Sequence, residues 1–304
     1  MKTVSIITVN YNQSYITEQL LTSVYATNHY AAIEIIVVDN ASKDNMVPVW
    51  KTQYPDITFI RSESNLGFAG GNNLGIKAAK GEYLFFVNND TEFTEGLVAG
   101  LVNILEENPT VGMVSPKIRY HDQPTVLQYA GFTNMNYYTM RNACIGQFEQ
   151  DNGQYDNNTG PTGYIHGAAM MVRREAIEKA GLMAENFFLY YEEMDWNDHI
   201  KRAGYQIWVQ PKALIYHKES VSVGRISGLK EYFMNRNRIL FIRRNAPSAL
   251  PVMMFYIYFI LIVTPRNIIN YTIKGHKGFT SLLLKAIWWN FTHDKNSADL
   301  GYQL

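Results

Sequence analysis

Short apolar segments alternate with helix-like segments along the first third of the chain, and this alternation restricts the fold more than any other feature. The apolar segments are continuous, whereas the intervening segments place apolar residues at helical spacing. Such alternation is typical of a mostly parallel, Rossmann-like sheet with helices on both faces. The sequence therefore predicts an α/β fold with Ser14 and Thr94 as helix caps. We expect strands at residues 4–9, 33–38, 57–61 and 83–87, and helices at 14–24, 69–79 and 94–105.

The remainder of the chain changes character twice. Residues 119–163 are rich in Asn, Gln, Gly, Tyr and Asp with weak periodicity, which indicates an irregular insert beside the acceptor site. Regular patterns return after it. We expect a catalytic domain over residues 1–224 and a helical tail over 225–304. Within the catalytic domain, further strands are predicted at 164–172, 206–209 and 213–216, and helices at 174–180 and 192–204.

Charge and hydropathy set the tail apart. The formal charge is −8 over residues 1–224 and +8 over residues 225–304, and basic flanks enclose an apolar run at 252–263. Twelve residues are short for crossing a bilayer, so this run, with Trp288 and Trp289, indicates a helix lying on a membrane surface. A core helix and a subunit interface, which would make a homodimer, are the alternatives, and the basic face could simply be solvated.

Polar residues at the strand ends predict where a ligand binds, because open α/β sheets bind ligands beyond the carboxyl ends of their strands. Asp39 follows the second strand, where its carboxylate could accept hydrogen bonds from a nucleobase or a ribose. Residues 65–73 contain three glycines that could bring the backbone close to a phosphate at a helix start. An ordinary turn and a flexible loop are the respective alternatives.

A metal site is predicted at the end of the fourth strand. Asn88, Asn89 and Asp90 combine amide and carboxylate oxygens, the ligands that a hard cation prefers. His217 follows a later strand and is the second candidate ligand. A turn and a structural histidine are the alternatives.

Three carboxylates open a predicted helix behind Tyr190 and Tyr191. They are Glu192, Glu193 and Asp195. Acidic residues suit a helix N-terminus, and a carboxylate beside a pocket can act as a general base. Glu192 and Asp195 share one helix face and Glu193 points elsewhere, so the residues alone do not select the base.

In this order the motifs resemble the family 2 glycosyltransferases, which have the GT-A fold. The resemblance covers about two thirds of the chain, and within the family the chain looks most like the rhamnosyltransferase-type enzymes of bacterial surface-polysaccharide assembly. The matching segments are 5–12, 37–42, 65–73, 88–90, 166–168, 187–195, 204–205 and His217.

The resemblance implies a role for each matching position. Asp39 matches the acid that binds the nucleobase, Asp90 and His217 match ligands of Mg²⁺ or Mn²⁺, and Glu193 matches the catalytic base. Two departures stand out: the metal motif keeps one carboxylate, which predicts weaker metal binding, and the base is Glu where the family usually has Asp. The implied donor site comprises Thr8, Asn10, Asn12, Asp39, Asn40, Asn65, Gly70, Asn73, Asn88 and Asn89.

The resemblance further implies inverting sugar transfer from a dTDP- or UDP-sugar to a glycan or polyprenyl-diphosphate-linked acceptor. We expect a cytoplasmic enzyme, peripheral on the inner face of the cell membrane, with no nucleic-acid partner. The sequence opens without a signal-peptide pattern, and its single cysteine, Cys144, allows no intrachain disulfide. A nucleotidyltransferase is disfavoured because residues 10–12 replace the expected basic Gly-rich loop. A non-catalytic membrane-binding module is disfavoured because acidic residues remain at the metal and base positions.

Overall fold

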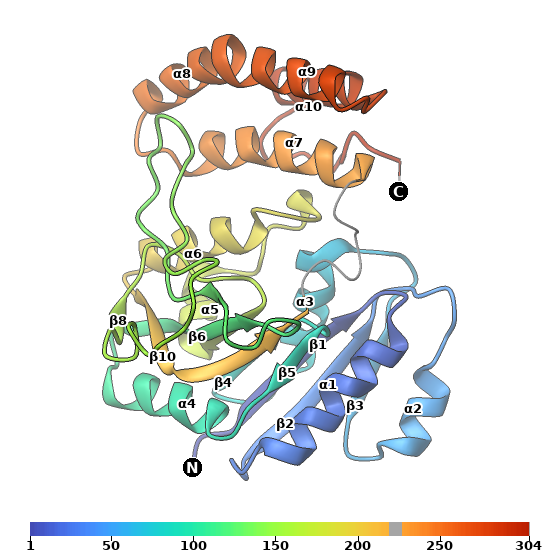
Figure 1. The fold of residues 1–304 in the computed structure, drawn as a ribbon. Helices are drawn as coiled ribbons and strands as arrows, with labels where there is room; N and C mark the ends of the chain where they lie inside the picture. The colour runs from blue at the N-terminus through green and yellow to red at the C-terminus, as the bar shows by residue number, and fades with distance from the viewer. Residues whose placement is uncertain (219–226, 304) are drawn as a thin grey trace.

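A ten-stranded sheet forms the lower part of the molecule, and a layer of helices lies above it (Figure 1). The computed structural model describes residues 1–218 and 227–303. The main path of the sheet runs β3-β2-β1-β4-β9-β6-β10-β5, with β7 beside β6 and β8 beside β10. The strands are β1 (Val4–Asn10), β2 (Ile33–Asp39), β3 (Thr58–Arg61), β4 (Tyr83–Val87), β5 (Thr91–Phe93), β6 (Val111–Tyr120), β7 (Leu127–Tyr129), β8 (Gly160–Pro161), β9 (Ala169–Arg173) and β10 (Gln206–His217).

The predicted α/β architecture with a mostly parallel main sheet is confirmed. Strands β1, β2, β3 and β4 pair in parallel, as do β6 and β10, whereas β9 runs antiparallel between β4 and β6. Parallel pairing of β1, β2 and β4 brings their carboxyl ends to one edge, which faces the helical layer (Figure 1). The helices of this part are α1 (Ser14–Thr27), α2 (Val47–Gln53), α3 (Gly67–Ala78), α4 (Leu97–Glu107), α5 (Arg174–Ala180) and α6 (Glu192–Arg202), with a 3₁₀ turn η1 at Glu185–Phe187.

Both faces of the sheet carry a hydrophobic core. One face packs β1, β2 and β4 against α1 and α4 around Trp50 and Leu101. The other packs them against α3, α5 and α6 around Phe86 and Trp196, whose rings meet edge to face at 5.4 Å. Continuous apolar strands are therefore required by burial on both sides.

Several local predictions differ from the structure. Strand β6 was not predicted, and the strand expected at 164–172 is only β9. The two strands expected at 206–216 form one bulged strand, β10, whose register shifts between Gln210 and Leu214. The caps also differ: α1 starts at Ser14 itself, and α4 follows Gly96 while the Thr94 hydroxyl donates to the Leu214 carbonyl at 2.6 Å. Tertiary contacts outweigh local capping signals in these places.

The insert at 119–163 is largely irregular, as predicted, and is anchored by buried charges. The Nζ atom of Lys117 on β6 lies 2.7 Å from Asp151 and 2.6 Å from Asp156, and Arg119 lies 2.6 Å from Asp151. From this anchor the insert rises to the helical layer, where the Arg238 guanidinium donates to the Thr139 carbonyl at 2.5 Å. The insert therefore connects the sheet to the helices above it.

The helical layer consists of α7 (Gly228–Asn245), α8 (Ala249–Tyr258), η2 (Phe259–Val263), α9 (Thr264–Ile273) and α10 (Phe279–Thr292). Its core includes Tyr164 and Phe187 of the sheet-bearing part, so the two parts share a hydrophobic cluster. The boundary predicted near residue 224 lies outside the described residues.

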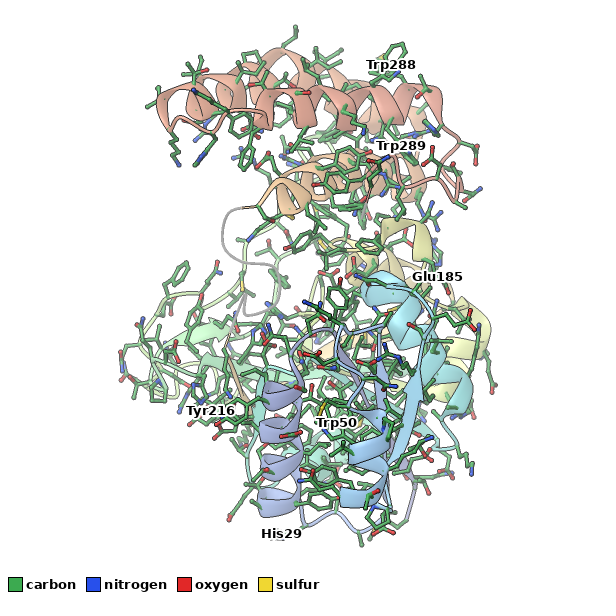
Figure 2. The ribbon with its side chains drawn as sticks, turned by 90° about the vertical axis from the view of Figure 1, so that its right-hand side faces the viewer. His29, Trp50, Glu185, Tyr216, Trp288 and Trp289 are labelled. Carbon is green, nitrogen blue, oxygen red and sulfur yellow. The ribbon has the colours of Figure 1, made fainter. Side chains whose placement is uncertain are left out.

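The apolar run at 252–263 lies within a longer helix, Ala249–Ile273. By length and composition alone this 25-residue helix could cross a bilayer, whereas the twelve-residue run considered from the sequence is too short to do so. In the most apolar 18-residue stretch of this helix, only 17% of the residues are buried inside the protein. Helix α10 also has one exposed side and one buried side: in Figure 2, Trp288 points outward and Trp289 points toward α7.

Candidate active site

Asp39 lies at the end of β2 in a buried polar cluster. Its Oδ1 atom accepts a hydrogen bond from Asn10 Nδ2 at 2.9 Å, and its Oδ2 atom forms an ion pair with Arg61. Arg61 was missed by the sequence reasoning, although it ends β3 directly opposite Asp39 in register. The same strand-end rule that selected Asp39 would have found it. Ser42 completes the cluster, because its hydroxyl accepts from Asn10 Nδ2 at 3.0 Å and from the Asn12 amide at 2.9 Å.

A chain of hydrogen bonds links Asp39 to the predicted metal motif. The Oδ1 atom of Asn10 accepts from the Thr17 hydroxyl at 3.0 Å, and that hydroxyl accepts from Asn89 Nδ2 at 3.1 Å. Thr8 lies fully buried on β1, and no described residue hydrogen-bonds its hydroxyl. The ends of β1, β2 and β4 are therefore held in fixed relative positions.

Asn40 fixes the turn before α3. Its Nδ2 atom donates to Asn65 Oδ1 and to the Gly67 carbonyl, each at 3.0 Å, and its Oδ1 atom accepts from the Leu66 amide at 3.0 Å. Asn12, at the end of β1, accepts from the Lys43 amide at 2.7 Å. These asparagines shape the loops that border the strand-end site.

The glycines of 65–73 make close packing contacts, and their predicted approach to a phosphate stays a prediction. A Cβ atom on Gly71 would lie 2.8 Å from Val9, and one on Gly70 would lie 2.6 Å from the Cβ atom of Leu66. Helix α3 therefore sits directly on β1. Asn73 is likewise engaged: its Nδ2 atom donates to the Met183 carbonyl and to Glu185, each at 2.9 Å. Asn73 thus holds α3 against the segment around η1.

Asp90 and His217 meet although they are 127 residues apart. The Nε2 atom of His217 lies 3.1 Å from Asp90 Oδ1, and Asn88 Nδ2 lies 3.5 Å from the same nitrogen. Burial acts to raise the pKa of Asp90, but the His217 imidazole outweighs it and holds the pKa below the usual aspartate range. No described residue gives Asp90 Oδ1 a well-directed hydrogen bond.

Gln128, on β7, orients this histidine. Its Oε1 atom lies 2.8 Å from His217 Nδ1. Because an amide oxygen only accepts, Nδ1 carries a hydrogen and Nε2 is the atom that faces the carboxylate. Gln128 belongs to the irregular insert, and no sequence signal marked it.

His166 borders the same site. Its ring meets that of His217 edge-on at 5.9 Å, and its Nδ1 atom accepts from the Ala168 amide at 3.1 Å. Burial and the neighbouring His217 lower the pKa of His166 to about 3, so this imidazole is neutral at physiological pH. The family resemblance, which includes residues 166–168, implies no role for His166.

At the start of α6, Glu192 is buried and Glu193 is half-buried. Burial, followed by repulsion from Glu193, raises the pKa of Glu192 well above the usual glutamate value, and burial also raises that of Glu193. Glu193 packs on Gly167, where a Cβ atom would lie 3.3 Å from Glu193 Cγ. The neighbouring Ala168 carbonyl accepts from the Asn88 amide at 3.0 Å. Glu193 therefore approaches the strand ends through residues 166–168.

Asp195 points into a different set of contacts. Its Oδ1 atom accepts from Arg244 Nε at 3.0 Å and from Asn245 Nδ2 at 2.6 Å, both on α7. Of the three acidic candidates, Asp195 is the one that joins α6 to the helical layer.

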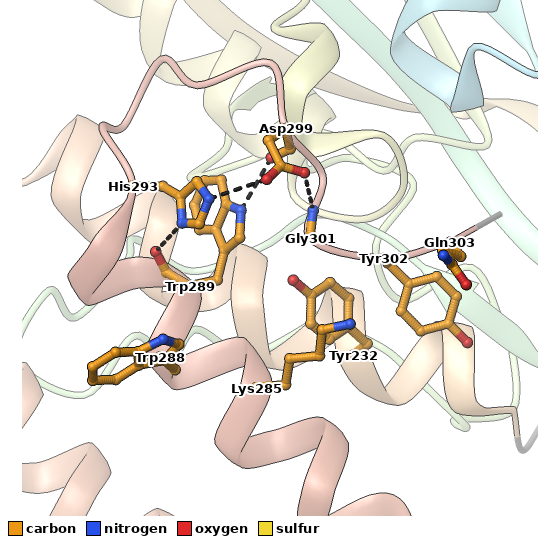
Figure 3. Close-up of a pocket in the computed structure, with 9 residues that line it drawn as sticks. All are labelled: Tyr232, Lys285, Trp288, Trp289, His293, Asp299, Gly301, Tyr302 and Gln303. Atoms are coloured by element: carbon orange, nitrogen blue, oxygen red, sulfur yellow. Dashed lines mark hydrogen bonds and ion pairs between the residues drawn. The ribbon is translucent and has the colours of Figure 1, made fainter.

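A separate hollow of about 520 Å³ lies within the helical layer (Figure 3). Its wall combines aromatic rings with the His293–Asp299 pair, which is 3.1 Å apart. None of the strand-end residues lines it, so it is distinct from the candidate site. The lining residues are Tyr232, Lys285, Trp288, Trp289, His293, Asp299, Gly301, Tyr302 and Gln303.

The chain is similar to known proteins in sequence. Residues 5–181 match the family described as Glycosyl transferase family 2. The N-acetylglucosaminyl-diphospho-decaprenol L-rhamnosyltransferase of Mycobacterium tuberculosis is 23% identical over 64% of this chain and 69% of its own length. The low-salt glycan biosynthesis hexosyltransferase Agl10 of Haloferax volcanii is 27% identical over 78% of this chain and 74% of its own.

Solved structures agree on the fold. A mannosyltransferase of Pyrobaculum calidifontis, in complex with GDP-Man and Mn²⁺, superposes with a TM-score of 0.60 at 18% identity, covering 96% of this chain and 87% of that one. Residues 1–349 of TarS from S. aureus give a TM-score of 0.58 at 15% identity over 95% and 81% of the two chains. The architecture is therefore the GT-A fold. With more than half of its length matching the family, the chain belongs to glycosyltransferase family 2.

Proposed function

We propose that the protein transfers a sugar, with inversion, from a dTDP- or UDP-sugar to a glycan or polyprenyl-diphosphate-linked acceptor in surface-polysaccharide synthesis. One arrangement carries this proposal. Glu193 packs on Gly167, and the neighbouring Ala168 carbonyl accepts a hydrogen bond from the Asn88 amide. Asn88 in turn lies beside the pair Asp90 and His217. A raised-pKa carboxylate thus adjoins a strand-end site suited to a nucleotide diphosphate.

The donor would lie along the carboxyl ends of β2, β1 and β4. Asp39, oriented by Asn10 and Arg61, faces the nucleobase end, and Asn88 and Asn89 adjoin the diphosphate. The two occupied oxygens of Asp39 each keep a lone pair for a base N–H or a ribose hydroxyl. Asn12, Asn40 and Asn65 support these loops, and Thr8, buried on β1, stays a predicted donor-site residue.

Asp90 and His217 fit a divalent cation. Two ligand atoms that bind one octahedral ion at right angles, each about 2.1 Å away, are about 3 Å apart, which matches the observed 3.1 Å. Asp90 Oδ1 lies beside His217 Nε2 without a well-directed hydrogen bond from any described residue, and a cation between the two atoms would give both a partner. Across residues 1–218 and 227–303 no cluster of three such side chains exists, so phosphate and water would complete the coordination. When bound, Mg²⁺ or Mn²⁺ would neutralise charge on the leaving diphosphate.

Glu193 is the proposed base. Its carboxylate takes the proton of the acceptor hydroxyl while that oxygen attacks the anomeric carbon, and the bond from this carbon to the diphosphate oxygen breaks on the opposite face. A pKa raised by burial strengthens the base near neutral pH. Glu192 would shape the field around Glu193, and Asp195 would hold α6 in position.

The proposed acceptor is lipid-linked, which the outer face of the helical layer supports. The apolar side chains of Leu250, Ile257 and Leu261 are 53%, 48% and 68% exposed. Between residues 246 and 293 there is no carboxylate side chain, whereas Arg266, Lys274, Lys277 and Lys285 are exposed. An apolar stripe with cations and no anions fits an anionic lipid leaflet better than a second copy of the chain. The protein would then lie on the inner face of the cell membrane.

Glu193→Gln tests the proposal directly. A dTDP- and UDP-sugar screen, starting with rhamnose donors, identifies the substrate by metal-dependent thermal stabilisation. Glu193→Gln should then abolish transfer while calorimetry shows donor binding close to wild type, and Glu178→Gln, on the exposed side of α5, should leave both unchanged. Transfer by Glu193→Gln at the wild-type rate would remove Glu193 from the role. Release of pyrophosphate instead of nucleoside diphosphate would contradict sugar transfer itself.

A further inference from the structure

The loop before the acidic pair has an unfavourable backbone. Phe188, Tyr190 and Tyr191 have φ values of +63°, +71° and +72°. Residues other than glycine rarely adopt positive φ values. Such residues persist only where the surroundings enforce them. Tyr191 is also the N-cap of α6, so its conformation sets the direction in which Glu192 and Glu193 leave the loop.

Asn237, a fully buried residue of α7, enforces this loop. Its Nδ2 atom donates to the carbonyl oxygens of Phe187, Leu189 and Tyr190, each at 2.8 Å. The neighbouring Arg236 orients the amide, because its guanidinium donates to Asn237 Oδ1 at 2.8 Å.

Arg236 is itself firmly held. It is fully buried, it lies 4.0 Å from the ring centroid of Trp289, and it donates to the Asn186 carbonyl at 2.7 Å. Together the adjacent residues 236 and 237 therefore engage four carbonyls of the loop.

The opposite side of the loop is held by α3. The Phe188 carbonyl accepts from the Phe68 amide at 2.8 Å. A Cβ atom on Gly67 would lie 2.1 Å from that carbonyl oxygen, so the contact requires glycine. The loop is thus clamped between the donor-side helix α3 and the helical layer.

We propose that Asn237 is a positioning residue for Glu193, acting through the backbone of residues 187–191; this inference rests on the proposed function. Without the amide, three carbonyls lose a donor and the left-handed residues can relax. The N-terminus of α6, and Glu193 with it, can then shift relative to Gly167, on which Glu193 packs. A displacement of about 1 Å in a catalytic group costs roughly 10²-fold in rate.

The test compares Asn237→Ala with Asn290→Ala. Asn290 is a similarly buried amide whose hydrogen bonds stay within α7 and α10: its Nδ2 atom donates to the carbonyls of Arg236 and Ala286, each at 3.0 Å, and its Oδ1 atom accepts from Arg243 at 3.2 Å. We expect Asn237→Ala to lower kcat roughly 10²-fold while donor KM and calorimetric nucleoside diphosphate affinity stay near wild type. Asn290→Ala should lose comparable thermal stability and keep the wild-type kcat.

Three outcomes would overturn the inference. They are wild-type kcat in a folded Asn237→Ala, an equal fall of kcat in Asn290→Ala, and a loss confined to donor affinity. If Asn237→Ala does not fold, Arg236→Lys, which removes the group that orients the amide, must lower kcat without changing nucleoside diphosphate affinity, and an unchanged kcat refutes the role. Absence of sugar transfer by the wild type would instead defeat the proposed function.

Discussion

Replacing Leu250, Ile257 and Leu261 together by serine should release the protein from anionic vesicles without unfolding it. These residues recur at helical spacing on the outer side of the helix Ala249–Ile273, and they point away from the core formed by Phe255 and Phe259. Substitutions of exposed side chains change the free energy of unfolding by about 0.5 kcal/mol or less each, so the melting temperature should hardly move.

The magnitude follows from the exposed fractions of the three side chains. Fully burying one Leu or Ile is worth about 1.5–3 kcal/mol, and exposures of 53%, 48% and 68% amount to about 1.7 side chains. A helix at the membrane surface immerses about half of that, or roughly 1.3–2.5 kcal/mol. At 1.4 kcal/mol per tenfold, the partition coefficient should fall about 10- to 60-fold.

Flotation with vesicles of increasing anionic lipid content measures this partition. The matched control is Val49→Ser with Leu182→Ser, which alters two exposed apolar residues, 52% and 40% accessible, that lie outside the helical layer. Binding should weaken with salt, because each Lys or Arg near the surface contributes about 1 kcal/mol that ions screen. If the triple variant floats as the wild type does, the membrane role of this face is refuted. If it instead dissociates a dimer, the face is a subunit interface.

Three further predictions concern the site. Because burial and Glu193 raise the folded-state pKa of Glu192, the wild type loses stability as pH rises from the ordinary glutamate pKa, about 4.3, through the raised value. Glu192→Gln stays neutral, so its melting temperature should match wild type in acid and exceed it near neutrality; a constant difference would contradict this. Asp195→Ala leaves Arg244, whose side chain is 13% exposed, without its carboxylate partner and should cost about 3 kcal/mol in urea unfolding, whereas a loss below about 1 kcal/mol would deny the pair its structural role. Gln128→Leu should weaken calorimetric Mn²⁺ binding in the presence of nucleoside diphosphate about 10- to 100-fold by freeing His217, and unchanged affinity would remove the pair from the metal site.

Local chemistry explains what the sequence predicted well. The continuous apolar runs of β1, β2 and β4 required burial on both faces, so the parallel sheet could be inferred without coordinates. Asp39 and Asp90 stay predicted site residues, which were chosen because strand ends in such sheets form one edge. These are short-range patterns with one dominant structural outcome.

Contacts between distant segments decided the rest. Gly71 reads as a loop glycine in sequence, but the approach of α3 to Val9 makes it a packing residue. In the sequence, nothing distinguishes the carboxylates of Glu193 and Asp195. In the fold, Glu193 packs on Gly167, whereas Asp195 forms an ion pair with Arg244. His217 and its partner Gln128 are 89 residues apart in the sequence. Asn237 lies about 50 residues from the carbonyl groups of 187–190 that accept its hydrogen bonds. The sequence by itself determined which residue types meet at the sheet edge, because burial and periodicity act locally. Which carboxylate faces the site was decided only by the tertiary structure, because that depends on neighbours brought together by folding.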